Sequence, residues 1–375
     1  MNILLIGEYS RLHNSLKEGL QALGHQVVLF GFNDGFKDYP VDFALYKQWD
    51  SGILKKIKLG FLKLTGFDLS SYWTYRQFLR YKKELQGFDV VQLINENSFY
   101  CDPKHERKIL DFIFKNNPKT FLLSCGDDYS NVTYNFAHPE QKSVVQPYLM
   151  GKIKDKAFIN VLKFRLPGFK QLHDFIYRNI AGVIATDFDY VPALKGNQKF
   201  LGLVPNPVNV TKFDFESLPL DKIVLFLGIN TENYYKKGSD YFEQALEIIR
   251  QKYPEKVEII VARSVPYAQY IQLYNRAHIV LDQVFSLDQG YNALEAMARG
   301  KVVFTGAGED FTAHYGLTQR VNIHVVPDVD SIVESLSELI ENPAEITAIG
   351  KRARQFIENE HDYIQIAQQY LNTWR

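Results

Sequence analysis

Residues 288–304 read DQGYNALEAMARGKVVF, and this stretch is the most informative in the chain. Gly290 opens a predicted helix, Glu295 lies about one turn into it, and Gly300 closes it before an apolar strand. The first turn of a helix offers unpaired backbone amides and a positive dipole end to an anion. Glu295 is within reach of a sugar diol beside that anion. Because a nucleotide contains a phosphate and a ribose diol side by side, the stretch predicts a nucleotide site.

Composition limits the class of protein. The chain has 375 residues, which is long for one domain and comfortable for two. Lys and Arg together number 43, as do Asp and Glu, so no net charge attracts the chain to nucleic acid. Cys101 and Cys125 are the only cysteines, which fits a reducing compartment. The N-terminus lacks a signal-peptide pattern, and no apolar run approaches the ~20 residues of a spanning helix. We therefore expect a cytoplasmic protein.

Apolar runs alternate with helical patterns along the chain. Continuous apolar runs are typical of parallel strands covered on both faces. A rigid turn at Pro205-Asn206-Pro207 interrupts this rhythm, and a second series follows it. The expected strands are 3–6, 27–30, 88–94, 120–124, 182–185, 222–228, 257–261, 279–281, 302–304 and 323–326, and the expected helices are 15–23, 239–251, 268–276, 290–299, 328–341 and 343–370. The sequence predicts an α/β protein with two Rossmann-like doubly wound domains, residues 1–207 and 208–360.

The stretch 288–304 resembles the nucleotide-sugar site of glycosyltransferase family 4, which carries Gly-x-x-x-x-Glu-Ala-Met-Ala-x-Gly-x-Pro-Val. Gly290, Glu295 to Ala298, Gly300 and Val303 match that pattern. The order of elements is similar along the whole chain, but only residues 223–305 carry specific motifs. The resemblance implies the GT-B fold, in which two Rossmann-like domains face a cleft. The acceptor would bind the first domain and the donor the second, and helix 361–375 would pack back on the first.

The diphosphate-binding motif of that family is only partly present. A Gly-Arg after the first strand and a Lys-Gly before the next helix hold the diphosphate in the family. Lys237-Gly238 matches the second pair, but Ile229 and Asn230 follow Gly228 in place of the Arg. Lys236 is the candidate substitute. Fixed cations at this position would stabilise the charge on the departing diphosphate. The alternative interpretation is that both lysines merely cap a surface loop.

A second departure concerns the donor sugar. The family usually has a Glu eight residues before the Glu295 position, and Leu287 stands there. Asp282 and Asp288 are the candidates for the sugar contact. A simpler interpretation of Glu295 is an acid favoured by the helix dipole. The residues implied to bind the donor are Gly228, Asn230, Lys236, Arg263, Ser264, Asp282, Asp288, Gly290, Tyr291 and Asn292.

The first domain offers fewer candidates. The loop after the first strand lacks Gly-x-Gly-x-x-Gly, which disfavours an NAD enzyme. In the family that the chain resembles, this loop faces the cleft, so Glu8 and His13 are acceptor-side candidates. For His13 the alternative is a residue at the start of a helix that packs on its neighbours. Asp127 follows another strand and is a candidate acceptor-side base, with a helix-capping acid as the alternative. The predicted catalytic residues are Lys237, Glu295 and Asp127.

Two further patterns bear on metals and membranes. Asp187-Phe188-Asp189 and Asp328-Val329-Asp330 spell Asp-x-Asp, but Asp328 opens a helix, where acids cap, and such triplets are common by chance. We expect no metal and no cofactor. Residues 53–64 alternate large apolar groups with lysines, a pattern that suits an anionic membrane surface. A lysine-rimmed core helix is the alternative. The lysines are Lys55, Lys56, Lys58 and Lys63.

These patterns together predict a glycosyltransferase that moves a sugar from a nucleoside diphosphate to a hydroxyl of a glycan or lipid-linked acceptor. The resemblance implies retained anomeric configuration and a place in surface polysaccharide or glycolipid synthesis. Two alternatives stay open. One is a nucleotide-sugar hydrolase or epimerase on the same fold, which a catalytic His pair in the cleft would favour. The other is a non-catalytic relative that binds a glycan or a partner, which the missing Arg and Glu would favour.

Overall fold

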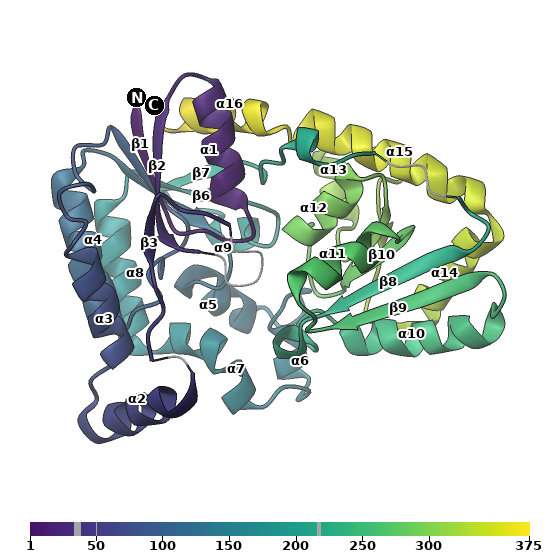
Figure 1. Ribbon diagram of the computed structural model, residues 1–375, viewed down its shortest axis with the longest axis horizontal. Coiled ribbons are helices and arrows are strands. Elements are labelled where there is room, and N and C mark those ends of the chain that lie inside the picture. The colour runs from purple at the N-terminus through teal and green to yellow at the C-terminus, as the bar shows by residue number, and fades with distance from the viewer. Residues whose placement is uncertain (34–38, 50, 216–218) are drawn as a thin grey trace.

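The computed structural model describes residues 1–33, 39–49, 51–215 and 219–375. Two parallel sheets lie side by side, each with helices on its faces (Figure 1). The first has the strand order β3-β2-β1-β4-β5-β6-β7, and the second has the order β12-β11-β10-β8-β9. In both sheets the central strands connect outward in two directions, which is the doubly wound arrangement. The predicted α/β class with two Rossmann-like domains is therefore confirmed.

The first sheet contains β1 (Asn2–Ile6), β2 (Gln26–Phe32), β3 (Phe43–Leu45), β4 (Val90–Leu93), β5 (Thr120–Ser124), β6 (Gly182–Ala185) and β7 (Phe200–Leu203). Its helices are α1 (Leu12–Ala22), α2 (Gly52–Thr65), α3 (Leu69–Phe78), α4 (Pro103–Asn116), α5 (Tyr129–Ala137), α6 (Gln146–Leu149), α7 (Asp155–Leu162), α8 (Pro167–Asn179) and α9 (Val191–Leu194). The second sheet contains β8 (Ile223–Ile229), β9 (Val257–Arg263), β10 (Ile279–Gln283), β11 (Val302–Thr305) and β12 (Ile323–His324). Its helices are α10 (Ser239–Lys252), α11 (Tyr267–Asn275), α12 (Tyr291–Ala298), α13 (Glu309–His314), α14 (Val329–Glu341) and α15 (Pro343–Glu360), and α16 (Tyr363–Thr373) ends the chain.

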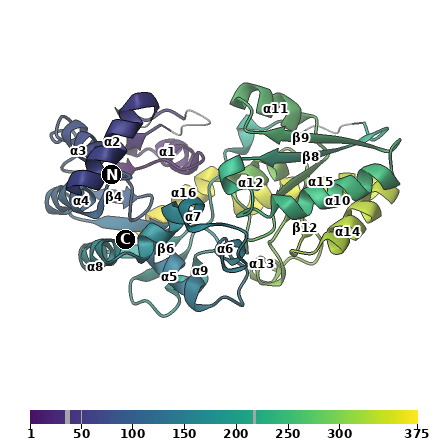
Figure 2. The same ribbon diagram turned by 90° about the horizontal axis from the view of Figure 1, so that it is seen from below.

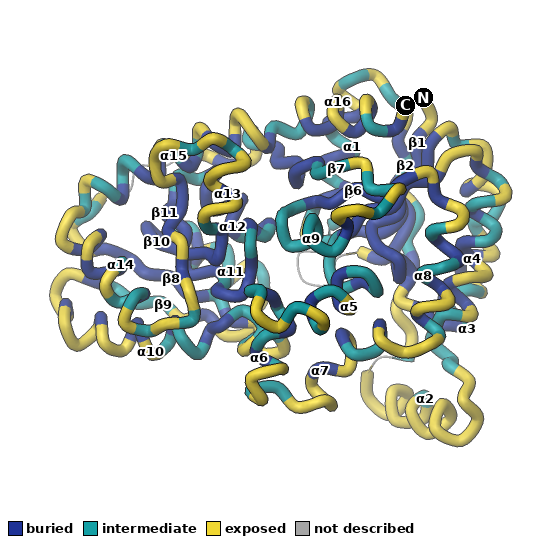
Figure 3. The backbone as a smooth tube through the Cα atoms, turned by 180° about the vertical axis from the view of Figure 1, so that it is seen from behind, coloured by how far each residue is buried: buried dark blue, intermediate teal, exposed yellow. Residues whose placement is uncertain are grey.

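The continuous apolar strands are explained by helices on both faces of each sheet. In β1, Leu4 and Ile6 belong to one buried cluster, whereas Ile3 and Leu5 belong to another. Successive side chains of a strand point to opposite faces, so two cores require apolar residues at every position. Figure 3 shows the result as two buried sheets inside a more exposed layer of helices.

The last predicted helix, 343–370, is wrong as a single element, because the structure divides it into α15 and α16. The backbone amide of Val208 donates to the carbonyl of His361 at 2.7 Å. The carboxylate of Asp362 then accepts from the amides of Ile364 and Gln365, which starts a new helix. This break lies beside the Pro205–Pro207 turn, so both connections between the two sheets meet at one place.

Helix α16 lies against α1 of the first domain, with Ile366, Ala367 and Tyr370 fully buried there. Gly19 of α1 permits this approach, because a Cβ at that position would lie 2.1 Å from the carbonyl oxygen of Tyr363. The indole of Trp374 donates to the side chain of Gln92 at 3.0 Å. Figure 2 shows the last two helices running from the second sheet back to the first.

Candidate active site

The N-terminus of α12 follows β10 and lies at the carboxyl edge of the second sheet. Gly290 is its N-cap residue, and no side chain caps the first amides. On the first turn, the side-chain amide of Asn292 donates to Oδ1 of Asp282 at 3.2 Å, and the ammonium of Lys237 binds the same oxygen at 2.9 Å. Asp282 therefore brings a cation next to an open helix N-terminus. Both features attract the same anion.

The backbone conformation and the packing at Gly238 explain why a glycine follows Lys237. It adopts a left-handed conformation with φ of 71°, and an added Cβ would lie 2.7 Å from Cβ of Val284. The carbonyl of Lys237 accepts a hydrogen bond from the amide of Val284 at 2.8 Å. The loop therefore packs tightly on the end of β10, and only glycine meets both demands. This packing fixes the side chain of Lys237 beside Asp282.

Asp282 itself is almost fully enclosed, with its side chain 1% exposed. Its Oδ2 atom has no hydrogen-bond partner among the described residues. A buried carboxylate oxygen without a partner is costly, and such atoms occur at functional sites. Asp282 lies in the second-domain part of the candidate site, where it orients Lys237, and its contact with a donor stays a prediction.

Glu295 is 4% exposed on α12. The phenol of Tyr39, from the first domain, lies 3.4 Å from its Oε1. Burial and the charge of Glu295 raise the pKa of Tyr39, so this phenol stays protonated and can donate. Glu295 is therefore enclosed at the boundary of the two domains, one turn from the open N-terminus of α12.

Other predicted donor residues have local partners. The Arg263 guanidinium pairs with Glu243 of α10, and the Ser264 hydroxyl lies 3.3 Å from that of Thr231. The side chain of Asn230 accepts from the amide of Glu232 at 3.0 Å, which caps a short helical turn. A Cβ on Gly228 would lie 2.7 Å from the Tyr270 ring. The structure gives these residues local contacts, and their contacts with a donor stay predictions.

Tyr291 and Asp288 join the domains. The Tyr291 hydroxyl donates to the carbonyl of Pro207, and its ring lies in the core around α1 and α16. Asp288 is 4% exposed, and its carboxylate accepts from the amides of Phe188 at 3.0 Å and Gln289 at 2.7 Å. Burial and the nearby charge of Asp189 raise the pKa of Asp288 to about 7. The structure places Asp288 in the domain interface.

Glu8 and His13 support the start of α1. The carboxylate of Glu8 accepts from the amides of Arg11 at 2.7 Å and Asn14 at 2.9 Å. His13 is fully buried, its Nδ1 lies 2.7 Å from the carbonyl of Gly7, and burial lowers its pKa to about 4. His13 thus matches the alternative of a packed helix-start residue.

Glu8 nevertheless borders a hollow of about 220 Å³ at the carboxyl edge of the first sheet. Lys47 lies 4.9 Å above the Tyr100 ring in this hollow. Ser10 and Tyr100, which also line it, have φ values of 51° and 52°, which side-chain-bearing residues rarely adopt. Strained backbone of this kind gathers at binding sites. The hollow is the candidate for part of the acceptor site.

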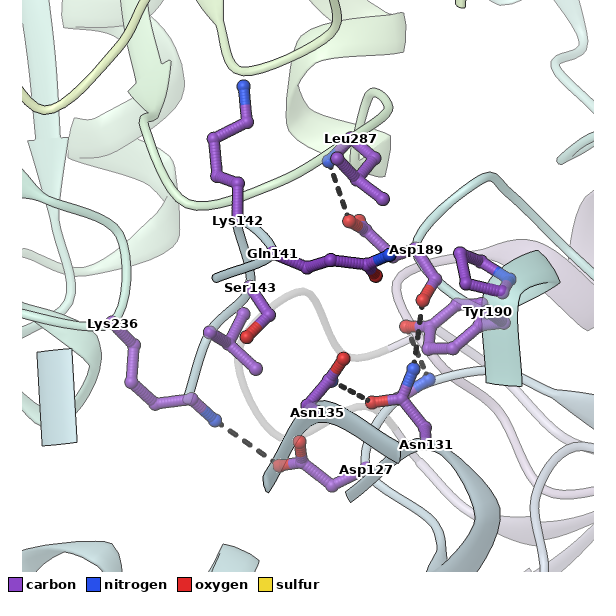
Figure 4. Close-up of a pocket in the computed structure, with 13 residues that line it drawn as sticks. Asp127, Asn131, Asn135, Gln141, Lys142, Ser143, Asp189, Tyr190, Lys236 and Leu287 are labelled. Carbon is purple, nitrogen blue, oxygen red and sulfur yellow. Dashed lines mark hydrogen bonds and ion pairs between the residues drawn. The ribbon is translucent and has the colours of Figure 1, made fainter. Parts of the chain in front are cut away.

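A cavity of about 160 Å³ lies between the domains (Figure 4). Asp127 at one side pairs with Lys236 of the second domain at 3.2 Å. Asp127 is not a helix cap, because the N-cap of α5 is Asp128, which accepts from the amide of Asn131 at 2.7 Å. The carboxylate of Asp127 therefore lies on the cavity wall. Lys236 and Lys237 are neighbours in one loop, and their side chains pair with different carboxylates, Asp127 and Asp282.

The sequence interpretation missed most of the cavity wall. Asn131 and Asn135 lie one turn apart on α5, and the side-chain amide of Asn135 donates to Oδ1 of Asn131 at 2.8 Å. Gln141, Lys142, Ser143 and Tyr190 also line the cavity. The spacing of the two asparagines on one helix face was the available signal, but α5 was not among the expected helices.

Asp189, from the Asp-x-Asp triplet of the first domain, borders the cavity opposite Asp127. Its Oδ1 accepts from the amide of Leu287 at 2.7 Å (Figure 4). Burial raises its pKa to about 6, while the Leu287 amide and the Lys142 charge oppose that rise. In the other triplet, Asp328 caps α14 by accepting from the amide of Ser331, which confirms that interpretation.

Comparison with known structures decides the fold. Sucrose-phosphate synthase from Thermosynechococcus elongatus superimposes with a TM-score of 0.61 at 14% identity, over 100% of this chain and 98% of that chain. The fold is GT-B. Anabaena HepE in complex with UDP and glucose has a TM-score of 0.56 at 11% identity, over 100% and 99% of the two chains. An α-glucosyltransferase in complex with UDP and a 13-mer DNA has a TM-score of 0.59 at 11% identity, over 99% and 98%.

Sequence comparison gives a narrower match. Residues 236–372 match a family described as glycosyl transferase-like. That range includes Lys236, Lys237, Asp282 and Glu295, so it covers the second-domain part of the candidate site. No curated protein matches the sequence. The family match concerns this part of the chain, and the GT-B neighbours concern the fold of the whole chain.

Proposed function

We propose that the protein is a glycosyltransferase that takes a sugar from a nucleoside diphosphate and joins it to a hydroxyl acceptor with retained anomeric configuration. The observation that carries this proposal is the arrangement of Lys237 beside the uncapped first turn of α12. A cation and a helix N-terminus at one point suit a diphosphate. Glu295 lies one turn away, where a ribose diol would bind.

In the reaction, the bond between the anomeric carbon and the diphosphate oxygen breaks, and the acceptor oxygen forms the new bond to that carbon. The nucleoside diphosphate leaves with an additional negative charge, which Lys237 and the α12 amides stabilise because they are fixed before the reaction. The proton of the acceptor hydroxyl passes to Asp127, on the first-domain wall of the cavity. HepE and the α-glucosyltransferase were both solved with UDP, so we propose a UDP-sugar as the first donor to test.

We propose that catalysis is independent of metal ions. The described residues contain no group of three or more His, Cys, Asp or Glu side chains arranged to hold a metal. Sugar transfer should therefore persist in EDTA at a rate close to that without it, because Lys237 and helix amides meet the charge of the leaving group. The measurement is the initial rate of product formation with and without chelator. Complete loss of activity that manganese restores would contradict this mechanism.

Helix α2 suits a membrane surface. None of its residues is buried, so the alternative of a core helix is wrong. Ile53 and Leu64 are 73% and 87% exposed, and the helix carries four lysines and no acid. It projects from the first domain in Figure 3. Within the described residues, no helix is long and apolar enough to cross a membrane. We propose that α2 lies on an anionic membrane and brings the site to an acceptor in surface polysaccharide or glycolipid synthesis, at the inner face of the membrane.

Residues 152–170 are a second stretch of lysines and large apolar residues in the first domain, and this stretch differs from α2. Phe158, Phe164 and Phe169 are buried in the core beneath the first sheet. Those rings stabilise the fold, so this stretch contributes to the membrane contact at most through exposed residues such as Ile159 and Leu166.

Replacing Lys55, Lys56, Lys58 and Lys63 with glutamine should abolish co-sedimentation with anionic vesicles, while donor hydrolysis in solution stays unchanged. Each lysine near such a surface contributes about 1 kcal/mol, and salt should weaken the binding. The matched control replaces four exposed lysines of the second domain, Lys222, Lys252, Lys256 and Lys351. Equal losses in both variants, or no binding by the native protein at low salt, would favour a soluble acceptor.

A thermal-shift screen against nucleotides and nucleotide sugars tests the proposed function, since a ligand that binds only the folded state must stabilise it. We expect one nucleoside diphosphate and its sugar conjugates to raise the melting temperature. Product analysis then separates the alternatives. Donor consumption without transfer to any acceptor would indicate a hydrolase or an epimerase, and no response to any nucleotide would indicate a non-catalytic relative.

A further inference from the structure

The two domains contribute unequally to the wall of the cavity between them. Of the residues that line it, only Lys236 and Leu287 come from the second domain. The side chain of Leu287 cannot form a hydrogen bond, and Lys236 is paired with Asp127 at 3.2 Å. Polar side chains of the first domain make up most of the remaining wall, namely Asp127, Asn131, Asn135, Gln141, Lys142, Ser143, Asp189 and Tyr190. Any polar molecule in the cavity must therefore be recognised mainly by the first domain.

Asp189 is held in a defined position in that wall. Its own amide donates to Oδ1 of Asp187 at 3.0 Å, and its carbonyl accepts from the side chain of Asn131 at 2.9 Å. The amide of Leu287 fixes Oδ1 of its carboxylate at 2.7 Å. Among the described residues no hydrogen bond to Oδ2 is formed, so this oxygen can accept from a ligand. A carboxylate that is fixed through one oxygen can bind hydroxyls strongly and with direction through the other.

The charge balance of the cavity indicates what kind of molecule fits. Lys236 neutralises Asp127. The ammonium of Lys142 is turned to the second domain, where it binds the carbonyl of Gly306 and lies 3.2 Å from Nε2 of His324 (Figure 4). Asp189 is thus the carboxylate in the wall without a directly paired cation. A ligand with hydroxyls suits this wall, whereas a second carboxylate would be repelled.

We propose that this cavity holds the transferred sugar, that Asp189 of the first domain accepts its hydroxyls, and that the sugar is uncharged and not a uronic acid. This inference rests on the proposed function. It assigns to the first domain the sugar contact that Leu287 cannot make, in place of the candidates Asp282 and Asp288, which do not line this cavity. Donor recognition is then divided, with the nucleotide on the second domain and the sugar on the first. Tight sugar binding requires both domains to be in contact.

The test compares calorimetric affinities at pH 7.5 for three nucleoside diphosphates, UDP, GDP and dTDP, with those for UDP-glucose, GDP-mannose, dTDP-rhamnose and UDP-glucuronic acid. The native protein should bind one neutral sugar nucleotide more tightly than its diphosphate, and it should reject the glucuronic acid conjugate. The Asp189→Asn variant should lose about tenfold or more of the affinity for that sugar nucleotide while its affinity for the diphosphate stays unchanged. It should also bind the glucuronic acid conjugate relatively better, a gain that misfolding cannot produce.

Asp288→Asn is the matched control. Asp288 also accepts an amide across the domain interface, but it does not line the cavity. An asparagine at 189 can still accept from the Leu287 amide, so there only the charge is removed. At 288 the variant also loses one of two backbone hydrogen bonds, because Phe188 and Gln289 donate to different carboxylate oxygens, so it disturbs the interface at least as much as Asp189→Asn. Asp288→Asn should preserve the sugar preference. The inference is overturned if both variants lose it equally, if Asp189→Asn leaves it intact, or if the native protein binds a diphosphate as tightly as all its sugar conjugates. Failure to bind any nucleoside diphosphate would instead contradict the proposed function.

Discussion

Replacement of Lys237 by alanine should lower kcat for sugar transfer by about 10²–10³-fold, the largest effect that we expect from a single substitution. Lys237 shares Oδ1 of Asp282 with Asn292 on the first turn of α12, and its ammonium would face the charge that develops on the leaving diphosphate. Binding of the intact donor should weaken much less, because the additional charge appears only as the bond breaks. The measurement is kcat and KM for the donor.

Lys237→Ala also changes the surroundings of Asp282. Among the described residues, its enclosed carboxylate would then keep only Asn292 as a hydrogen-bond partner. Removing one member of such a pair destabilises a protein. The double variant Lys237→Ala/Asp282→Asn removes both charges and serves as the control. It should recover thermal stability and remain as slow as the single variant. Recovery of the rate with the stability would show that Lys237 has only a structural role.

Replacement of Glu295 by alanine should weaken nucleotide binding by roughly 1.5–3 kcal/mol, because the lost contact is a charge-assisted hydrogen bond to the ribose diol. Glu295→Gln should lose less, since the amide oxygen still accepts a hydrogen bond. The fold should survive in both. Calorimetric titration with the nucleoside diphosphate measures the effect.

Tyr39→Phe provides the control for Glu295. It removes the phenol that lies 3.4 Å from Oε1 of Glu295 and leaves the carboxylate in place. A loss of affinity in Tyr39→Phe equal to that in Glu295→Ala would mean that Glu295 acts through the domain contact. Unchanged nucleotide affinity in Glu295→Ala would contradict its assignment to the diol.

The local structure of the second-domain part of the candidate site could be predicted from the sequence, because its elements are adjacent in the chain. Gly290, Glu295 and Gly300 lie within one strand-helix-strand unit, and their roles depend on helix geometry that a short stretch of sequence encodes. Gly300 takes a left-handed conformation with φ of 76° directly after α12, as expected of a glycine that closes a helix. The position of the loop containing Lys237 could be predicted equally well from the sequence, since the loop follows β8 and precedes α10.

The cavity could not be predicted in this way, because its wall joins segments that are far apart in the chain. Asp127, Asp189 and Leu287 follow three different strands of two sheets, and only the docking of the domains brings them together. The partners of Asp288 and Tyr291 show the same limit. Both belong to the motif stretch, yet their contacts are with Phe188 and Pro207 of the other half of the chain. A motif gives the residue types of a site, whereas the domain interface decides which of them meet a ligand.

The central claim is that a nucleoside diphosphate binds between Lys237 and the N-terminus of α12, with its ribose on Glu295. A crystal structure of the protein with the nucleoside diphosphate that stabilises it most tests this claim directly. We predict diphosphate oxygens within hydrogen-bonding distance of the first α12 amides and of the Lys237 ammonium, and ribose hydroxyls on the Glu295 carboxylate. A nucleotide bound at the carboxyl edge of the first sheet, or one whose diphosphate lies away from α12, would contradict the account.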